Sequence, residues 1–228
     1  MTSSFRETSW TLVEQSRGKD EAARLALSEL CTRCYAPVHK FIALWCRDQE
    51  AARDLTHSFF ARVLEGGSLN GAERERGRFR SYLLGAVKHF LWEATAHDQR
   101  LKRGLQHEHV PLDDEPLNDE RTLPPDAEFD RAWACALLER ALASLREEME
   151  ASGKGAVFEA LKPWLAGTAV QGQQLEAAKV VGISETAVRV LVHRLRKRFR
   201  EIIEGEVSQT LEPGADIAAE LRHLLAVL

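Results

Sequence analysis

The chain has 228 residues, of which 44% are hydrophobic and 29% charged, a balance typical of folded rather than disordered proteins. Aromatic residues make up only 7%, and alternating runs of Val, Ile and Thr are scarce, so the composition predicts an all-α fold. No stretch has the apolar length of a membrane span or of a signal peptide. We therefore expect no membrane span and a cytoplasmic location, where the four cysteines stay reduced.

The net charge of −4 conceals two basic blocks with an acidic segment between them. Residues 74–103 and 189–200 are rich in Arg and Lys, whereas residues 113–130 are rich in Asp and Glu. Nucleic-acid binding depends on where the charge is placed and not on its average, so this pattern is compatible with a DNA-binding protein.

Residues 1–18 are expected to form a leader ahead of the first helix. Apolar residues at helical spacing predict that helix from about 19 to 46, with a kink or break at Pro37 because proline lacks the amide hydrogen that a helix needs. Asp48 is in position to cap a second helix, which we expect to end at about Leu64.

A polar, glycine-rich loop separates this pair from a third predicted helix, from Phe79 to about Leu101. The three helices define a first domain at residues 19–103. Residues 104–128 combine several prolines with many acidic residues, which is typical of a flexible linker.

A second small helical domain is expected at residues 129–204, beginning with a helix that Gly153 and Gly155 interrupt. Residues 205–228 are expected to form a C-terminal helical extension. One face of that extension carries an apolar stripe, which must be buried on its own domain or on a partner. The stripe consists of Ile217, Leu221, Leu224 and Leu225.

Residues 175–200 have the pattern of a helix-turn-helix whose second helix can lie on DNA. Ala178 is small enough for two helices to cross closely, and Gly182 can adopt the positive φ of a tight turn. Ile183 is expected to insert into the core, and Ser184 to cap the second helix. The buried stripe of that helix is predicted to be Val188, Leu191, Leu195 and Ile202.

The opposite face of this helix is polar and basic, as binding in the major groove requires. The positions after the cap are expected to face base edges, where Arg189 can bind guanine and Glu185 can accept from cytosine. The basic residues further along are expected to hold phosphates. The predicted DNA-binding residues of this helix are Ser184, Glu185, Thr186, Arg189, His193, Arg194, Arg196 and Lys197.

The chain resembles the extracytoplasmic-function (ECF) subfamily of the sigma-70 family, which directs bacterial RNA polymerase to promoters. The helix-turn-helix is similar to the family's motif for the promoter −35 element. Residues 48–60 (DQEAARDLTHSFF) and 77–84 (GRFRSYLL) are similar to its polymerase-binding helix and its −10-recognition segment. The resemblance covers residues 20–104 and 130–204 and leaves out the leader and the tail.

This resemblance implies a protein without enzymatic activity, cofactor or metal, because the polymerase supplies the chemistry. Its implied partners are core RNA polymerase, bound through the first domain, and promoter DNA. Polymerase binding is implied for Asp48, Glu50, Asp54, Leu55, Phe59 and Phe60. Recognition and melting of the −10 element are implied for Arg76, Arg78, Phe79, Arg80, Ser81, Tyr82, Lys88, His89, Trp92, Arg100, Lys102 and Arg103.

The polymerase-binding segment departs from the family pattern, because an acidic cluster is missing and Arg53 reverses one charge. An electrostatic docking surface should therefore bind it less well. Thr56 and Ser58 are candidate phosphorylation sites, since a phosphate would add roughly −1.5 to −2 charges. We favour the alternative that hydrophobic contacts suffice. A Ser/Thr kinase and an anti-sigma factor are candidate further partners.

Cys31, Cys34 and His39 suggest a zinc site, but such a site needs four ligands, and the cysteine spacing equally suits neighbouring core positions on a helix. No nucleophile elbow or phosphate-binding glycine loop indicates an enzyme. The alternative function is a helix-turn-helix regulator that binds its operator without replacing sigma on core polymerase.

Overall fold

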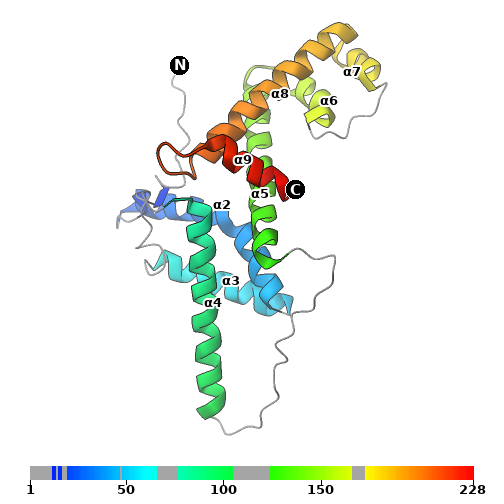
Figure 1. The fold of residues 1–228 in the computed structure, drawn as a ribbon. Helices are drawn as coiled ribbons and strands as arrows, with labels where there is room; N and C mark the ends of the chain where they lie inside the picture. The colour runs from blue at the N-terminus through cyan, green and yellow to red at the C-terminus, as the bar shows by residue number, and fades with distance from the viewer. Residues whose placement is uncertain are drawn as a thin grey trace. The chain divides into compact units, whose positions relative to one another are not determined.

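The computed structural model describes residues 12–13, 15–16, 20–46, 48–65, 77–104, 124–165 and 173–228, with the side chains of 97–104 and 173–176 left out. Every regular element in these residues is an α-helix and none is a strand, which confirms the predicted all-α class (Figure 1). The helices are α2 (Glu21–Trp45), α3 (Gln49–Leu64), α4 (Phe79–Gly104), α5 (Pro125–Ala151), α6 (Gly155–Leu165), α7 (Gln173–Val181), α8 (Glu185–Ser208) and α9 (Ile217–Ala226). None of them combines the length and the apolar character that crossing a bilayer requires.

The chain forms two compact units. Unit 1 comprises Met1–Ala136 and Gln209–Leu228, and unit 2 comprises Leu137–Ser208. The helix α5 therefore contributes its first turns to unit 1 and the remainder to unit 2. The C-terminal segment, which we expected to be a separate extension, belongs to unit 1.

In unit 1, α2 packs against α3 and α4. The core between them includes Phe59, whose ring contacts Phe60 and Phe90 edge-on at centroid distances of 5.2 and 5.5 Å. Asp48 caps α3 as predicted, since its carboxylate accepts from the backbone N–H groups of Glu50 and Ala51 at 3.3 and 2.9 Å. A single charged side chain thus fixes where this helix begins.

Pro37 does not break α2, contrary to one of the two outcomes that we expected. The helix continues from Glu21 to Trp45 and changes direction along its length (Figure 1). The proline ring is buried among core residues of the helix, so packing compensates for the missing hydrogen bond.

We expected the second domain to begin at 129, whereas the first unit extends to Ala136 and includes Phe129 and Trp133. Phe129 contacts Phe41 edge-on at 6.1 Å, and Trp133 lies 6.2 Å from the ring of Phe79. The last four residues of the predicted linker are helical as well, since α5 begins at Pro125. Burying two large aromatic rings on unit 1 outweighs the linker-like composition just ahead of them.

Unit 2 has one hydrophobic core, built from the end of α5 and from α6, α7 and α8. Gly153, between α5 and α6, has a φ of 72°, a conformation that glycine adopts without strain. Leu161 and Val188 are fully buried at the centre. Near the edge of this core, Arg140 of α5 binds the buried Glu206 of α8 at 3.1 Å.

Candidate nucleic-acid interface

The turn between α7 and α8 has the geometry that the sequence predicts. Gly182 has a φ of 72°, and the N–H of Ile183 donates to the carbonyl of Ala178 at 3.0 Å, which closes the end of α7. The hydroxyl of Ser184 accepts from the N–H of Ala187 at 3.2 Å, so the predicted cap of α8 is confirmed. The chain therefore enters α8 at a fixed point.

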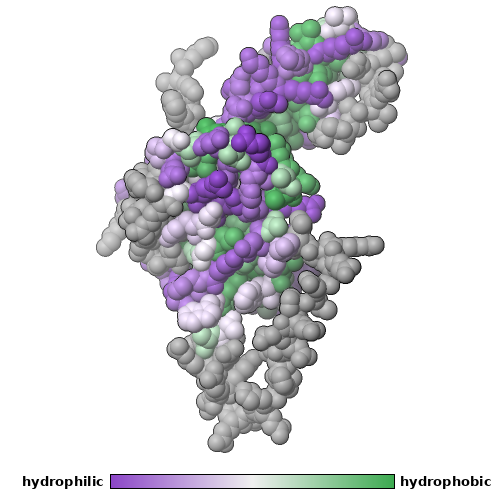
Figure 2. Space-filling view, in the orientation of Figure 1, coloured by the Kyte–Doolittle hydropathy of each residue, from purple (hydrophilic) through white to green (hydrophobic). Residues whose placement is uncertain are grey.

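The two faces of α8 are sharply different. Val188 and Leu195 are buried, and Leu191 and Ile202 pack against the same cluster, which confirms the predicted stripe. Figure 2 shows hydrophilic residues along α8 beside a band of hydrophobic ones. Exposed residues of the first turns are Glu185, Thr186 and Arg189, the three that we expected to face DNA bases.

The guanidinium of Arg189 lies 3.8 Å from the carboxylate of Glu185, and both side chains are exposed. An exposed ion pair of this kind contributes little to stability. A guanidinium and a carboxylate side by side can bind a guanine and a cytosine edge, respectively.

Further along α8 a group of cations extends the exposed face. His193, Arg194 and Lys197 are exposed and were predicted to bind DNA; Arg200 lies one turn beyond Lys197. Within the part of the chain that the structure describes, no hydrogen bond or ion pair occupies these four side chains. We call His193, Arg194, Lys197 and Arg200 the open cationic face.

Arg196, also predicted to bind DNA, has a structural contact. Its guanidinium donates through Nε and Nη2 to the carbonyl of Trp164 at 3.2 and 2.9 Å, which satisfies an acceptor at the end of α6. Arg198 binds Glu148 and Glu201, and these hydrogen bonds raise the pKa of its guanidinium further. The sequence reveals neither contact, because both Trp164 and Glu148 lie far from α8 along the chain.

The segment predicted to recognise the −10 element begins α4, in unit 1. Arg78 and Ser81 are exposed, and Tyr82 is half-buried. Phe79 is fully buried, with its N–H donating to the carbonyl of Thr210 at 2.9 Å. Arg80 is 5% exposed and forms ion pairs with Asp130 and Glu220. In this arrangement of unit 1 both Phe79 and Arg80 are buried, so neither can contact DNA as we predicted.

The remaining residues predicted on α4 are more accessible. Lys88 is exposed and binds Asp126 at 2.6 Å, while His89 lies 3.7 Å from Glu93. Trp92 is 67% exposed, and its ring lies 6.4 Å from that of His89. Arg100, Lys102 and Arg103 fall in the last turns of α4, where side chains are not described, and Arg76 lies outside the described residues.

The predicted polymerase-binding residues of α3 divide into two sets. Asp48, Glu50 and Asp54 are exposed, and hydrogen bonds from the N–H groups of Ala51 and Glu50 lower the pKa of Asp48. Leu55 is half-buried. The predicted polymerase contact does not fit Phe59, which is fully buried, whereas Phe60 is 8% exposed and lines an apolar groove between α2 and α3.

The two candidate phosphorylation sites also differ. Thr56 is fully buried, its hydroxyl donating to the carbonyl of Ala52 at 2.7 Å and lying 3.2 Å from Nδ1 of His39. Ser58 is exposed. A kinase could reach only Ser58 in this fold, which corrects the inclusion of Thr56.

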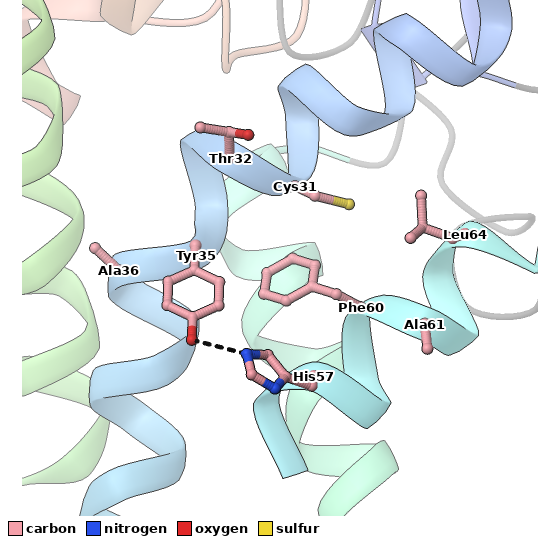
Figure 3. Close-up of a pocket in the computed structure, with 8 residues that line it drawn as sticks. All are labelled: Cys31, Thr32, Tyr35, Ala36, His57, Phe60, Ala61 and Leu64. Carbon is pink, nitrogen blue, oxygen red and sulfur yellow. Dashed lines mark hydrogen bonds between the residues drawn. The ribbon is translucent and has the colours of Figure 1, made fainter. Parts of the chain in front are cut away.

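An apolar groove between α2 and α3 is a feature that our sequence reasoning missed (Figure 3). It has a volume of about 560 Å³. Its lining residues are Cys31, Thr32, Tyr35, Ala36, His57, Phe60, Ala61 and Leu64. A helical projection of the sequence could have indicated this groove, because it shows the large side chains Tyr35 and Leu64 on outward faces of two neighbouring helices.

The polar groups of this groove are few. The hydroxyl of Tyr35 lies 3.4 Å from Nε2 of His57. Figure 3 marks this hydrogen bond with a dashed line. Burial raises the pKa of the Cys31 thiol to about 11, so this sulfur is a weak nucleophile at neutral pH. Among the described residues no cluster of His, Cys, Asp and Glu could hold a metal ion, and Cys34 packs in the core. The groove is thus suited to apolar contacts.

Comparison of this chain with protein-family models, with curated proteins and with solved structures finds no match.

Proposed function

We propose that this protein is a sigma factor of the ECF type, which binds core RNA polymerase and directs it to promoters. The observation that carries the proposal is the open cationic face of α8 behind a capped turn. A helix that presents Thr186 and Arg189 at its exposed start and Arg194 and Lys197 beyond them has the order of groups that major-groove recognition requires. In this proposal α8 recognises the −35 element.

The exposed part of α4 supplies groups suited to single-stranded DNA. Lys88 carries a positive charge and Trp92 presents an accessible ring, on which an unstacked base can lie. A tryptophan that is 67% exposed contributes little to core packing, so its exposure supports a binding role. We assign the −10 element to this helix.

The groove between α2 and α3 is our proposed contact for core polymerase. Tyr35 and Leu64 are 36% and 53% exposed along it, and the acidic residues Asp48, Glu50 and Asp54 lie exposed on the same α3. Apolar area can supply affinity where the family's acidic cluster is missing, since burial does not depend on charge. Ser58 is the accessible position at which a kinase could add charge, one turn from Asp54.

The decisive experiment is run-off transcription with purified core RNA polymerase and a library of candidate promoters. We expect promoter-specific transcripts that require this protein, together with a stoichiometric complex in gel filtration. The alternative, a helix-turn-helix regulator, would bind an operator alone and form no such complex. Absence of both the complex and the transcripts, with unmodified and with kinase-treated protein, would refute the proposal.

Two matched variants test the polymerase contact. Leu64→Glu places a charge on the groove and should weaken the complex with core polymerase at least tenfold, because an unpaired carboxylate must then be desolvated. Leu25→Glu makes the same change at a 66% exposed position of α2 that does not line the groove, and should leave binding unchanged. Equal binding by both variants would place the polymerase contact elsewhere.

A further inference from the structure

The C-terminal tail, Gln209–Leu228, covers the beginning of α4 within unit 1 (Figure 1). The carbonyl of Thr210 accepts the N–H of Phe79 at 2.9 Å. Further along the tail, Asp216 caps α9 by accepting from the N–H of Ala219 at 3.0 Å, and Leu224 is buried. The tail is therefore docked by its backbone at one end and by an apolar side chain at the other.

Between these two points, Glu220 reaches the arginines that begin α4. Its Oε1 accepts from Nε of Arg80 at 3.2 Å, and its Oε2 lies 3.1 Å from Nε of Arg78. Glu220 is only 1% exposed. Two guanidinium groups converging on one buried anion is an arrangement that proteins use to bind phosphate.

The tail makes a second contact close to Arg80, through His223 of α9. His223 lies 2.8 Å from Asp130, and Asp130 also pairs with Arg80. Of the two carboxylates around Arg80, the tail thus supplies that of Glu220 and holds that of Asp130 through His223. While the tail is docked, Nε of Arg80 donates to Glu220 and Nη1 donates to Asp130, and the residue is 5% exposed.

The fit of the tail is imperfect. Among the described residues, two buried side-chain oxygens have no hydrogen-bond partner, Oε1 of Gln209 and Oε2 of Glu220, and both belong to the tail. The ion pair of Arg78 with Glu220 meets the distance but not the alignment of a hydrogen bond. An unsatisfied buried acceptor costs free energy, so this contact is weaker than a fully matched one.

We propose that the tail is an internal competitor of nucleic acid, in which Glu220 occupies the place of a strand phosphate on Arg78 and Arg80. Single-stranded DNA gains these two cations only when the tail leaves α4. The tail therefore sets the fraction of molecules whose α4 is competent to bind, and apparent affinity falls by that fraction. Its role at promoters rests on the proposed sigma-factor function, whereas the competition itself does not.

The test compares Leu224→Asp with Leu225→Asp in the full chain. Leu224 is 4% exposed and Leu225 is 62% exposed, so the first variant expels α9 and the second makes the same change on its outer face. The probe is a fluorescein-labelled 12-nucleotide single-stranded DNA of mixed sequence, with anisotropy recorded at several salt concentrations. Neither of the two replaced residues is among those that we propose to bind the probe.

Leu224→Asp should bind the probe about tenfold more tightly than the unmodified chain. The slope of log affinity against log salt should steepen by about 1.4, since each added phosphate contact contributes about 0.7 on a single strand. The amide of Phe79 should also exchange its hydrogen faster, because its acceptor Thr210 has left. Leu225→Asp should match the unmodified chain in all three measurements.

Glu220→Gln provides a second variant if Leu224→Asp loses helix content by circular dichroism. It keeps the shape of the tail but removes the charge that competes with phosphate, and should tighten probe binding, whereas Glu212→Gln, at an exposed position of the same tail, should not. Unchanged binding and slope in a folded Leu224→Asp or in Glu220→Gln would overturn the competition. Failure of the unmodified chain and both variants to support transcription, with probe binding tightened as expected, would refute only the sigma-factor proposal.

Discussion

The start of α4 in unit 1 and the exposed face of α8 in unit 2 are both arginine-rich, yet their arginines have different fates. Along α8, Arg194 and Lys197 face outward with no described partner. At the start of α4, Arg80 is enclosed by Asp130 and Glu220. The number of cations in a segment therefore does not determine how well it can bind an anion. That capacity depends on whether carboxylates of the same chain already pair with those cations.

The largest effect is expected at Arg80. Arg80→Ala leaves the carboxylates of Asp130 and Glu220 buried without their cation and should lower the free energy of unfolding of unit 1 by about 3–5 kcal/mol. Arg78→Ala should cost less than about 1 kcal/mol, because that side chain is 46% exposed. Chemical denaturation followed by circular dichroism measures both, and equal losses would show that Arg80 is no structural cation.

The next effect is expected on α8, where we propose that exposed cations bind DNA. Changing Arg194, Lys197 and Arg200 to Ala together should weaken binding to duplex DNA by on the order of a hundredfold and lower the salt slope by about 2.7, as about 0.9 is lost per cation. Arg198→Ala is the control on the same helix, because Glu148 and Glu201 already hold that guanidinium. A loss of affinity in the control equal to the triple variant would contradict the open cationic face.

The contrast also shows which features the sequence predicts well. The cap at Ser184, the turn at Gly182 and the buried stripe of α8 depend on residues within one turn or two of each other, and all three were predicted. The same holds for Asp48, whose hydrogen-bond partners are two and three residues away. Local spacing fixes local structure, because the groups that satisfy each other are neighbours.

The features that were missed depend on contacts between distant residues. Arg80 and Glu220 are 140 positions apart, and Arg196 and Trp164 are 32 positions apart. The amphipathic tail was predicted to bury a stripe, but helical spacing alone does not reveal which surface receives it, and Leu225 turned outward instead. Identifying such partners requires the fold itself.

Arg196 allows the comparison to be sharpened within one helix. Arg196→Ala removes the donor to the carbonyl of Trp164 and should lower the stability of unit 2 by about 1–2 kcal/mol. Lys197→Ala, at the next position, should change stability by less than about 0.5 kcal/mol while weakening DNA binding. Thermal melts and DNA titrations of the two variants separate the roles, and a stable Arg196→Ala that loses DNA affinity would reverse our assignment.

The smallest expected effect concerns the residues that cap α3 in unit 1 and α8 in unit 2. Hydrogen bonds from the N–H groups of Ala51 and Glu50 lower the pKa of Asp48 below its ordinary value of 3.8. A carboxyl with a lowered folded-state pKa contributes stability that is fully present above the ordinary value and is lost as the pH falls through the lower one. The cap of α8 is the neutral hydroxyl of Ser184, which does not titrate in this range.

The stability difference between the unmodified chain and Asp48→Ala should therefore be largest at neutral pH and should shrink below pH 3.8. Ser184→Ala should cost about 1 kcal/mol at every pH at which the chain stays folded. Thermal melts of the three proteins between neutral pH and pH 3 measure both differences. If the loss of stability in Asp48→Ala did not depend on pH, the charge of Asp48 would not contribute to capping α3. The caps of α3 and α8 would then work in the same way.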